Sequence, residues 1–180
     1  MDQAHIAELV RSGAPEAFDA LLEAHGSEIQ GVAYLILRDR FDAEDVLSET
    51  LITAWQKGRE LRDPAALRPW LLRIATNKAL SARRRRTRVV QVRDTMDFGG
   101  PDTTGPSASR LAVLAAVDRL PLEMRAAIVL HYFADLSVAD VAAAMGKSQN
   151  TIKSQLRVGL ARMRSTFEER TGTEVTAHVA

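Results

Sequence analysis

Hydrophobic residues recur every three to four positions along most of the chain, which is the spacing of amphipathic helices, and strand-like alternation is rare. The first such stretch runs from Phe18 to His25, and a second runs from Ile29 to Leu37. Because Gly26 lies between them, the pattern predicts two helices here. The fold is predicted to be all-α.

A third helix is predicted to begin at Asp42 and to end near Gly58. Asp42 suits an N-cap, and Glu44 and Asp45 follow in the first turn, where the helix dipole favours carboxylates. The predicted buried stripe of this helix consists of Val46, Leu47, Leu51, Ala54 and Trp55.

A fourth helix is predicted to follow the pair Asp63-Pro64, which suits an N-cap and a first helical position. Pro69 lies early enough in this helix to be tolerated, or it marks the true start. Apolar residues recur from Trp70 to Leu80, and the helix then enters a basic run of Arg83, Arg84, Arg85, Arg86 and Arg88.

The segment from Asp94 to Ser109 separates two predicted helical modules. Thirteen of its sixteen residues are Asp, Thr, Gly, Pro or Ser, which is the composition of a linker. The sequence therefore predicts two small helical domains, residues 1–90 and 111–170, joined by a flexible linker over residues 91–110. Residues 171–180 are expected to form a frayed tail.

The second module has the pattern of a helix-turn-helix. Pro121 is predicted to open a helix. Ser137 and Asp140 then resemble a capping box at the start of a short helix, and Gly146 occupies the position of a left-handed C-cap. After this turn, Ser148 can cap a longer last helix.

The outward face of that last helix carries side chains that read bases in the DNA major groove. Asn and Gln bond adenine bidentately, Lys and Arg bond guanine, and Ser bonds a phosphate or a base edge. Residues 147–167 also contain five basic residues and no acidic one. A solvated polar face is the alternative, but the cap, the turn and the uncompensated charge together favour DNA binding. The candidates are Ser148, Gln149, Asn150, Lys153, Ser154 and Arg157.

The formal net charge of +1 conceals a division along the chain. Residues 1–56 contain three basic and eleven acidic residues, a balance of −8, and residues 57–93 contain twelve basic and two acidic residues, a balance of +10. Residues 94–180 balance to −1. An acidic block followed by a basic block indicates an anionic partner.

The composition argues against several classes of protein. The chain has no cysteine, which removes disulfides, thiolate zinc sites and cysteine nucleophiles. Its apolar runs are far shorter than the roughly 18 residues of a membrane helix, and residues 1–30 show no secretory signal. We therefore expect a cytoplasmic protein without membrane insertion. The four His residues are scattered and no glycine-rich phosphate loop is present, so no cofactor, metal or enzyme activity is expected.

Three motifs occur in a characteristic order. Residues 42–50, DAEDVLSET, continuing to Trp55, resemble the core-polymerase-binding helix of bacterial sigma factors. Residues 70–77, WLLRIATN, followed by the arginines, resemble the segment that reads the -10 promoter element in the extracytoplasmic function (ECF) group of sigma factors. The -35-reading domain of that group resembles Leu120-Pro121 with Arg125, then residues 151–154 and 162–164. The resemblance covers about residues 14–167.

This resemblance implies a non-catalytic subunit that recruits core RNA polymerase to -10/-35 promoters and assists melting. Core polymerase would bind Asp45, Ser48, Glu49 and Gln56 on the acidic third helix. The basic block would hold the melted -10 strand, with one base flipped into a loop pocket, and the arginine run would contact duplex phosphates. Thr151 joins the -35 candidates. The residues implied for the -10 element are Lys57, Arg59, Arg62, Arg68, Trp70, Arg73, Asn77, Lys78, Arg83, Arg84, Arg85 and Arg86. An anti-sigma protein is implied as a candidate partner.

The sequence also departs from the family pattern. Ser48 stands where the family usually has Gln, and Thr76 and Ser81 replace a common Arg and Asp. Trp70, between apolar neighbours, has a second interpretation as a core residue. Positions that are frequently basic in the last helix carry Gln155, Val158 and Leu160, which predicts fewer phosphate contacts.

A conventional helix-turn-helix regulator with an N-terminal sensing or dimerisation domain is the alternative. It explains residues 110–170 equally well, but it gives no reason for the acidic helix, the motif at residues 70–77 and the arginine run in that order. Binding of core polymerase separates the two hypotheses, because an ordinary regulator binds duplex DNA alone.

Overall fold

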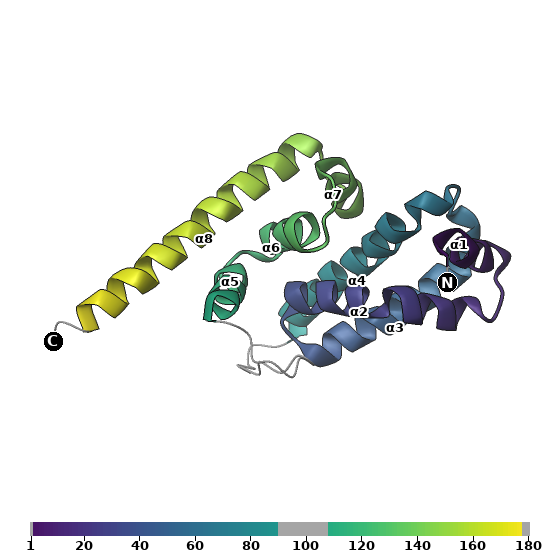
Figure 1. Ribbon diagram of the computed structural model, residues 1–180, viewed down its shortest axis with the longest axis horizontal. Coiled ribbons are helices and arrows are strands. Elements are labelled where there is room, and N and C mark those ends of the chain that lie inside the picture. Colours follow the sequence, from purple (N-terminus) through teal and green to yellow (C-terminus); the bar gives the residue numbers. More distant parts are fainter. Residues whose placement is uncertain (1, 90–107, 178–180) are drawn as a thin grey trace.

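A computed structural model describes residues 2–89 and 108–177, with side chains for residues 2–85 and 110–167. Every regular element in these ranges is helical, and the helices form two modules, which confirms the predicted all-α, two-domain fold (Figure 1). The predicted linker lies outside the described residues except at its end, where a helix begins at Ala108. None of the described helices is both long enough and apolar enough to cross a membrane.

The N-terminal module is built on three long helices. They are α2 (Ala17–Leu37), α3 (Arg40–Lys57) and α4 (Leu67–Val89), and their shared core includes the fully buried side chains of Ile29, Ile36, Leu51, Leu71 and Leu72. Two short 3-10 turns, η1 (Gly58–Glu60) and η2 (Pro64–Ala66), connect α3 to α4. Asp63 caps η2 by accepting a hydrogen bond from the Ala65 amide at 2.9 Å, with Pro64 in the first position, as predicted.

A short first helix, α1 (Gln3–Ser12), lies over the turns between α3 and α4 and was not predicted. Its apolar side, Ile6, Ala7 and Val10, is buried. Gly58 of η1 lies so close to α1 that a Cβ atom would be 1.9 Å from the carbonyl oxygen of Val10. Only glycine allows this approach, which packs η1 directly against α1.

Two predicted boundaries in this module are wrong. The chain from Ala17 to Leu37 is one continuous helix, because a single glycine costs a helix only about 1 kcal/mol and Gly26 is buried close to Leu22. The N-cap of α3 is Asp39, whose carboxylate accepts a hydrogen bond from the Asp42 amide at 3.0 Å, so the helix begins at Arg40. The predicted end is confirmed, since Gly58 follows the last helical residue.

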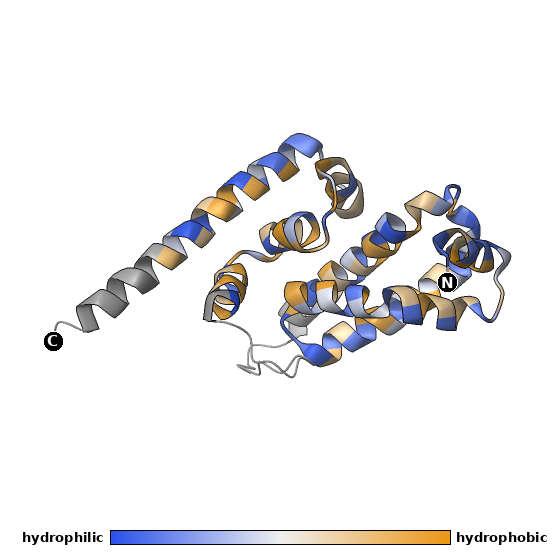
Figure 2. Ribbon diagram, viewed as in Figure 1, coloured by the Kyte–Doolittle hydropathy of each residue, from blue (hydrophilic) through white to orange (hydrophobic). Residues whose placement is uncertain are grey.

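The C-terminal module contains four helices and a π-helical turn. They are α5 (Ala108–Asp118), α6 (Leu122–Ile128), the turn η3 (Val129–Phe133), α7 (Val138–Met145) and α8 (Gln149–Ala177). Figure 2 shows that α7 is mainly hydrophobic, while hydrophilic and hydrophobic residues alternate along the described side chains of α8. The backbone of α8 continues to Ala177, into the stretch predicted as a tail, and no proline interrupts it.

The two modules are in contact, with α7 packed on α4 and α5 and α6 beside α2 (Figure 1). Arg125 of α6 donates to the carbonyl oxygen of Ile36 at the end of α2 at 3.1 Å. Asp118 at the end of α5 forms an ion pair with Arg38, which lies just past α2. The linker composition predicted two independent domains, but it gave no indication of this contact.

Candidate nucleic-acid and polymerase interfaces

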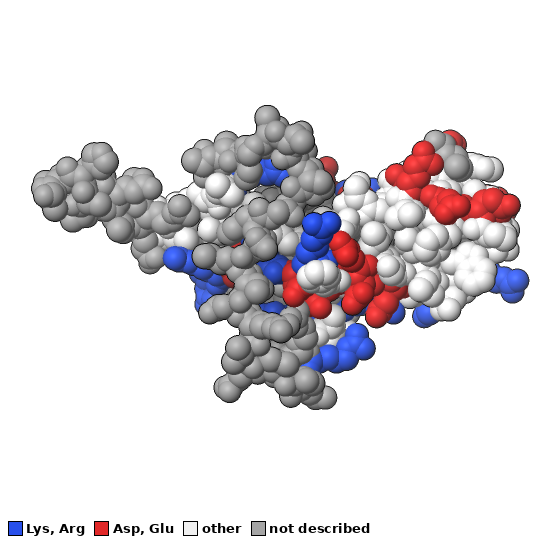
Figure 3. Space-filling view, turned by 90° about the horizontal axis from the view of Figure 1, so that it is seen from below, with Lys and Arg blue, Asp and Glu red and all other residues white. Residues whose placement is uncertain are grey.

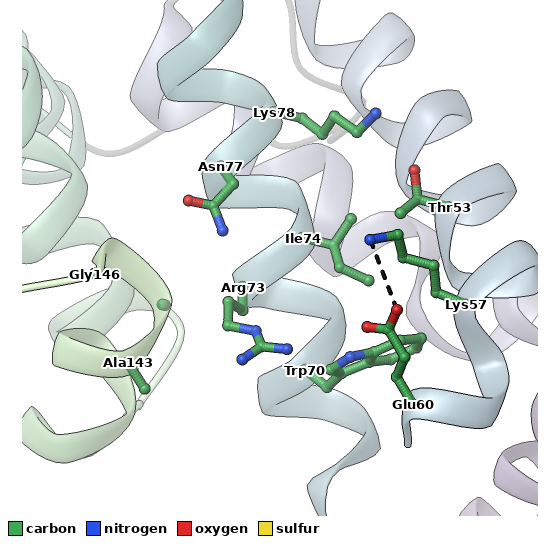
Figure 4. A pocket seen from close by; sticks show the side chains of 11 residues that line it. Thr53, Lys57, Glu60, Trp70, Arg73, Ile74, Asn77, Lys78, Ala143 and Gly146 are labelled. Atoms are coloured by element: carbon green, nitrogen blue, oxygen red, sulfur yellow. Dashed lines mark ion pairs between the residues drawn. The ribbon is translucent and has the colours of Figure 1, made fainter.

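A pocket of about 370 Å³ lies where α3 and α4 meet, and α7 borders it on one side. Residues at helical spacing on α4 supply the largest share of its lining, because positions three, four, seven and eight residues apart share one helix face. Figure 4 shows Arg73 and Asn77 on the side of α4 nearest α7, with Trp70 and Lys57 across the pocket. The lining consists of Thr53, Lys57, Glu60, Trp70, Arg73, Ile74, Asn77, Lys78, Ala143, Ala144 and Gly146.

The interpretation of Trp70 as a core residue is confirmed, and its role at the -10 element stays a prediction. Its side chain is only 8% exposed and belongs to the core, yet it also lines the pocket. Arg73 and Asn77, one turn and two turns further along α4, are exposed. An aromatic wall beside cationic and amide side chains can accept an unstacked base and its phosphates.

Five of the residues predicted for the -10 element meet at this pocket: Lys57, Trp70, Arg73, Asn77 and Lys78. Arg59 and Arg62 are exposed on the connecting loop, and Arg83, Arg84 and Arg85 are exposed along the end of α4. The side chain of Arg86 lies outside the described residues. Arg68 points elsewhere, into the contact between the modules, where it is half-buried.

The exposed face of α3 carries the residues predicted to bind core polymerase. Asp45, Ser48, Glu49 and Gln56 are all exposed. Figure 3 views the molecule from below, the side on which α3 lies in Figure 1, and shows acidic side chains gathered there. Glu49 also pairs with Lys78 across 3.1 Å, so the acidic face and the pocket adjoin.

Exposed aromatic and aliphatic side chains on α3 are functional candidates that the sequence analysis missed. Phe41 is 77% exposed and Ile52 is 47% exposed. Trp55 was assigned to the buried stripe, which is wrong: it is 44% exposed and donates through Nε1 to the carbonyl oxygen of Gly13 at 3.1 Å. It lies in the last turn of α3, where the end of α1 rather than the core is the nearest partner. Apolar residues between acidic ones could have signalled a docking face.

The helix-turn-helix has the caps that its sequence predicts. The Asp140 amide donates to Ser137 Oγ at 3.1 Å, and that hydroxyl donates to the Asp140 carboxylate at 2.6 Å. Gly146 ends α7 at φ 63°, a left-handed conformation that suits glycine. Ser148 then accepts a hydrogen bond from the Thr151 amide at 3.1 Å and caps α8. These caps fix the angle at which α8 leaves the turn.

The predicted reading face of α8 is exposed along its first turns. Ile152 and Leu156 turn inward and are buried. Gly159 lies against Met124 and Ile128 of α6, with only 3.1 Å from its Cβ position to either side chain. The outward residues, all exposed, are Ser148, Gln149, Asn150, Thr151, Lys153, Ser154 and Arg157.

Two histidines, His25 and His131, lie outside these surfaces. His131 contacts the carbonyl oxygen of Leu136 through Nδ1 at 2.7 Å and packs edge-on against Tyr132. Burial lowers the pKa of His25, with Glu28 opposing the shift and Arg68 adding to it. No group of three potential metal ligands occurs in the parts of the chain that the structure describes.

Comparisons with known proteins agree with this geometry. The family profile of Sigma-70 region 2 matches residues 21–89, which include the α3 face and the α3 and α4 residues of the pocket, and that of Sigma-70, region 4, matches residues 110–163. The ECF RNA polymerase sigma factor SigL of Mycobacterium tuberculosis is 33% identical over 88% of this chain and 95% of its own. The chain belongs to the ECF sigma factor family.

Two further proteins show how far this likeness extends. The ECF sigma factor SigM of Mycobacterium tuberculosis is 33% identical over 82% of this chain and 75% of its own. The sigma factor RpoE from Bartonella quintana, solved in complex with the anti-sigma factor NepR, superposes with a TM-score of 0.73. It is 26% identical over 85% of this chain and 98% of its own. As an ECF sigma factor, the chain is a non-catalytic subunit that directs RNA polymerase to promoters.

Proposed function

We propose that three regions of this sigma factor bind three different partners. The α3 face binds core polymerase, the α3–α4 pocket holds the melted -10 strand, and the outward face of α8 reads the -35 element. The observation that carries the proposal is the pocket. It gathers one aromatic, one amide and three basic side chains, which the family resemblance assigns together to the -10 element.

The pocket suits a single base. Its volume of about 370 Å³ falls within the range of roughly 300–1,000 Å³ that is typical of ligand sites. Trp70 offers a stacking or wedging surface, Asn77 offers an amide to a base edge, and Lys57, Arg73 and Lys78 offer charge to the backbone. Arg59, Arg62 and Arg83 to Arg86 extend this charge to flanking phosphates, which raises affinity without reading sequence.

The exposed face of α3 is acidic and that of α4 is basic, so α3 suits core polymerase and α4 suits DNA. Asp45, Ser48, Glu49 and Gln56 present acidic and polar groups, which repel DNA and complement a basic protein surface. The exposed Phe41, Ile52 and Trp55 add apolar area to that docking face. The first turns of α8 present amide, hydroxyl and basic groups that suit base edges of the major groove.

Two further parts of the proposal concern partner and location. RpoE from Bartonella quintana is solved with an anti-sigma factor, and this likeness supports an anti-sigma protein as a regulator of this chain too. Cytoplasmic location follows from the need to reach polymerase and promoter DNA. The domain boundaries proposed are residues 1–90, 91–110, 111–170 and 171–180.

Permanganate footprinting of the open promoter complex tests the pocket assignment. Arg73→Ala and Asn77→Ala should each reduce thymine reactivity at the -10 element while duplex binding at the -35 element stays unchanged. The matched control is Arg11→Ala, which removes an exposed arginine that forms an ion pair with Glu8 on α1. Unchanged reactivity in both pocket variants would remove the pocket from the -10 site.

A further inference from the structure

The α3–α4 pocket contains a carboxylate, that of Glu60, among lining side chains that are otherwise neutral or basic. Glu60 is the last residue of η1, and its side chain is 58% exposed. A carboxylate repels the phosphates of a DNA strand, so it weakens a site whose only task is to attract the backbone. Its presence beside Lys57, Arg73 and Lys78 therefore indicates a second task, which is contact with a base.

The backbone around Glu60 is held in place on both sides. Gly58, two residues earlier, packs against the carbonyl oxygen of Val10 in α1, and the Leu61 amide donates to the carbonyl oxygen of Gly58 at 3.0 Å. Leu61 is itself buried, with 2% of its surface exposed. Because the turn is anchored before and after Glu60, the carboxylate extends from a fixed point of the pocket wall.

Glu60 and Lys57 place a hydrogen-bond acceptor and a donor side by side in the pocket (Figure 4). Lys57 Nζ lies 3.7 Å from Glu60 Oε1, and the two side chains are 56% and 58% exposed. An exposed ion pair of this kind contributes little to stability, because water and salt screen it. Both groups are therefore available to a ligand that offers a donor to Glu60 and an acceptor to Lys57.

Two DNA bases offer that combination through an exocyclic amine. Cytosine carries its N4 amine beside N3, adenine carries its N6 amine beside N1, and both ring nitrogens accept hydrogen bonds. A carboxylate only accepts and an ammonium only donates, so they match the amine and the ring nitrogen respectively. Thymine and guanine carry a carbonyl oxygen in place of this amine, and the carboxylate repels it. Stacking on Trp70 suits every base and adds no selectivity.

We infer that Glu60 selects the base that enters the pocket, and that this base carries an amine beside a ring acceptor, as cytosine and adenine do. The amine donates to the Glu60 carboxylate, and the ring nitrogen accepts from the Lys57 ammonium. The inference rests on the proposed function, which places a melted -10 base in this pocket. Glu60 thus adds a specificity-determining residue to a site whose -10 candidates from the sequence include no acidic residue.

Promoter selection by the holoenzyme tests this inference. Core polymerase with the full chain transcribes a library in which each non-template base of the -10 element is varied in turn, and sequencing of the transcripts gives the base preference at each position. At one position cytosine or adenine should exceed thymine and guanine by about tenfold, as expected for a hydrogen-bonded base contact. Which of the two amino bases leads identifies the ligand.

Glu60→Gln should abolish this preference at that position alone, because an amide both donates and accepts and therefore suits amino and carbonyl bases equally. Base analogues test the same contact from the DNA side. The 2-pyrimidinone nucleotide lacks the amine of cytosine, and the purine nucleotide lacks that of adenine. Native holoenzyme should lose about tenfold in promoter opening on the analogue of the preferred base, and the Glu60→Gln holoenzyme should show no further loss.

The matched control is Glu8→Gln. Glu8 of α1 is exposed and lies 3.6 Å from Arg11 three residues later, so the variant removes the same charge and the same kind of ion pair away from the pocket. It should leave every base preference unchanged. A Glu60→Gln effect that is equal for all four bases would overturn the inference, because it would show that Glu60 only adjusts the charge of the pocket. So would a guanine preference that Glu60→Gln removes, since guanine donates to a carboxylate through N1 and N2.

Two results separate this inference from the proposed function. Unchanged promoter opening in both Arg73→Ala and Asn77→Ala would contradict the assignment of the pocket to the -10 strand. Impaired opening in those variants, together with native base preferences in Glu60→Gln, would contradict the role of Glu60 alone.

Discussion

Replacing Gly58 with alanine should uncouple α1 from the loop beside the pocket. A Cβ atom here would lie 1.9 Å from the carbonyl oxygen of Val10 and 2.6 Å from its carbonyl carbon. Both neighbours are backbone atoms, so no side-chain rotation relieves the clash. Either η1 shifts with the pocket residues on it, or α1 leaves its site.

The structure bounds the cost of this change. If α1 stays docked and the backbone strains, the loss is that of overpacking, about 1–3 kcal/mol. If α1 detaches, Ile6 and Val10, which are 2% and 1% exposed, become solvated at about 1.5–3 kcal/mol each. The free energy of unfolding should therefore fall by about 1–6 kcal/mol.

Urea denaturation, monitored by tryptophan fluorescence, measures the stability of the N-terminal module. Trp55 and Trp70 are the only two tryptophans, and both lie in the N-terminal module. Trp55 also bonds to Gly13 at the end of α1, so its emission should shift to the red when α1 detaches.

The control is Gly31→Ala, because Gly31 lies exposed within α2 and its Cβ would meet nothing within 4 Å. Alanine there should stabilise the helix by about 0.5–1 kcal/mol. Equal stability of the Gly58→Ala and Gly31→Ala variants would refute the close-approach argument. Gly58→Ala should also weaken promoter opening while -35 duplex binding is retained.

Two other predictions concern the α8 and α3 surfaces, and a third concerns the buried His25. Lys153→Ala or Arg157→Ala should weaken -35 recognition by about 1–3 kcal/mol if the side chain makes a bidentate base contact, and unchanged binding across -35 variants would remove it from the reading face. Reversing the charge of Asp45 and Glu49 together should lower affinity for core polymerase in a pull-down without weakening duplex DNA binding, and an unaltered pull-down would contradict the docking face. Burial lowers the pKa of His25 from 6.5, so the unfolded chain binds more protons, and stability should fall as the pH drops from 6.5 through the folded value. His25→Asn should flatten that part of a plot of unfolding free energy against pH, and an unchanged slope would show that another group causes it.

Local signals predicted the C-terminal module well because each depends on one or two side chains. The predicted caps are present at Ser137 with Asp140, at Gly146 and at Ser148. A hydroxyl caps an amide three residues later, and a glycine ends the preceding helix, so both act through nearby backbone atoms. The exposure of the proposed reading face of α8 followed from helical periodicity.

Predictions that depend on tertiary packing were wrong more often. Gly26 resembled a break but lies buried in a continuous helix, and Asp42 resembled the cap that Asp39 provides. Trp55 matched the apolar stripe, but its place in the last turn of α3 left it half-exposed. These outcomes depend on which neighbour is available, and periodicity does not specify neighbours.

The contact between the modules was the feature that the sequence predicted least. Arg68 was grouped with the -10 residues by charge, yet its partners Glu28 and Ala134 are 40 and 66 positions away. Such separation carries no periodic or motif signal. The α4 residues of the pocket, by contrast, share one face of that helix and could be grouped from spacing.

Run-off transcription with purified core RNA polymerase on a library of promoters is the decisive measurement. Addition of this chain should yield transcripts that core enzyme alone does not make, from templates enriched in two conserved blocks at -10 and -35. Absence of any chain-dependent transcript across the library would contradict its role as a promoter-directing subunit.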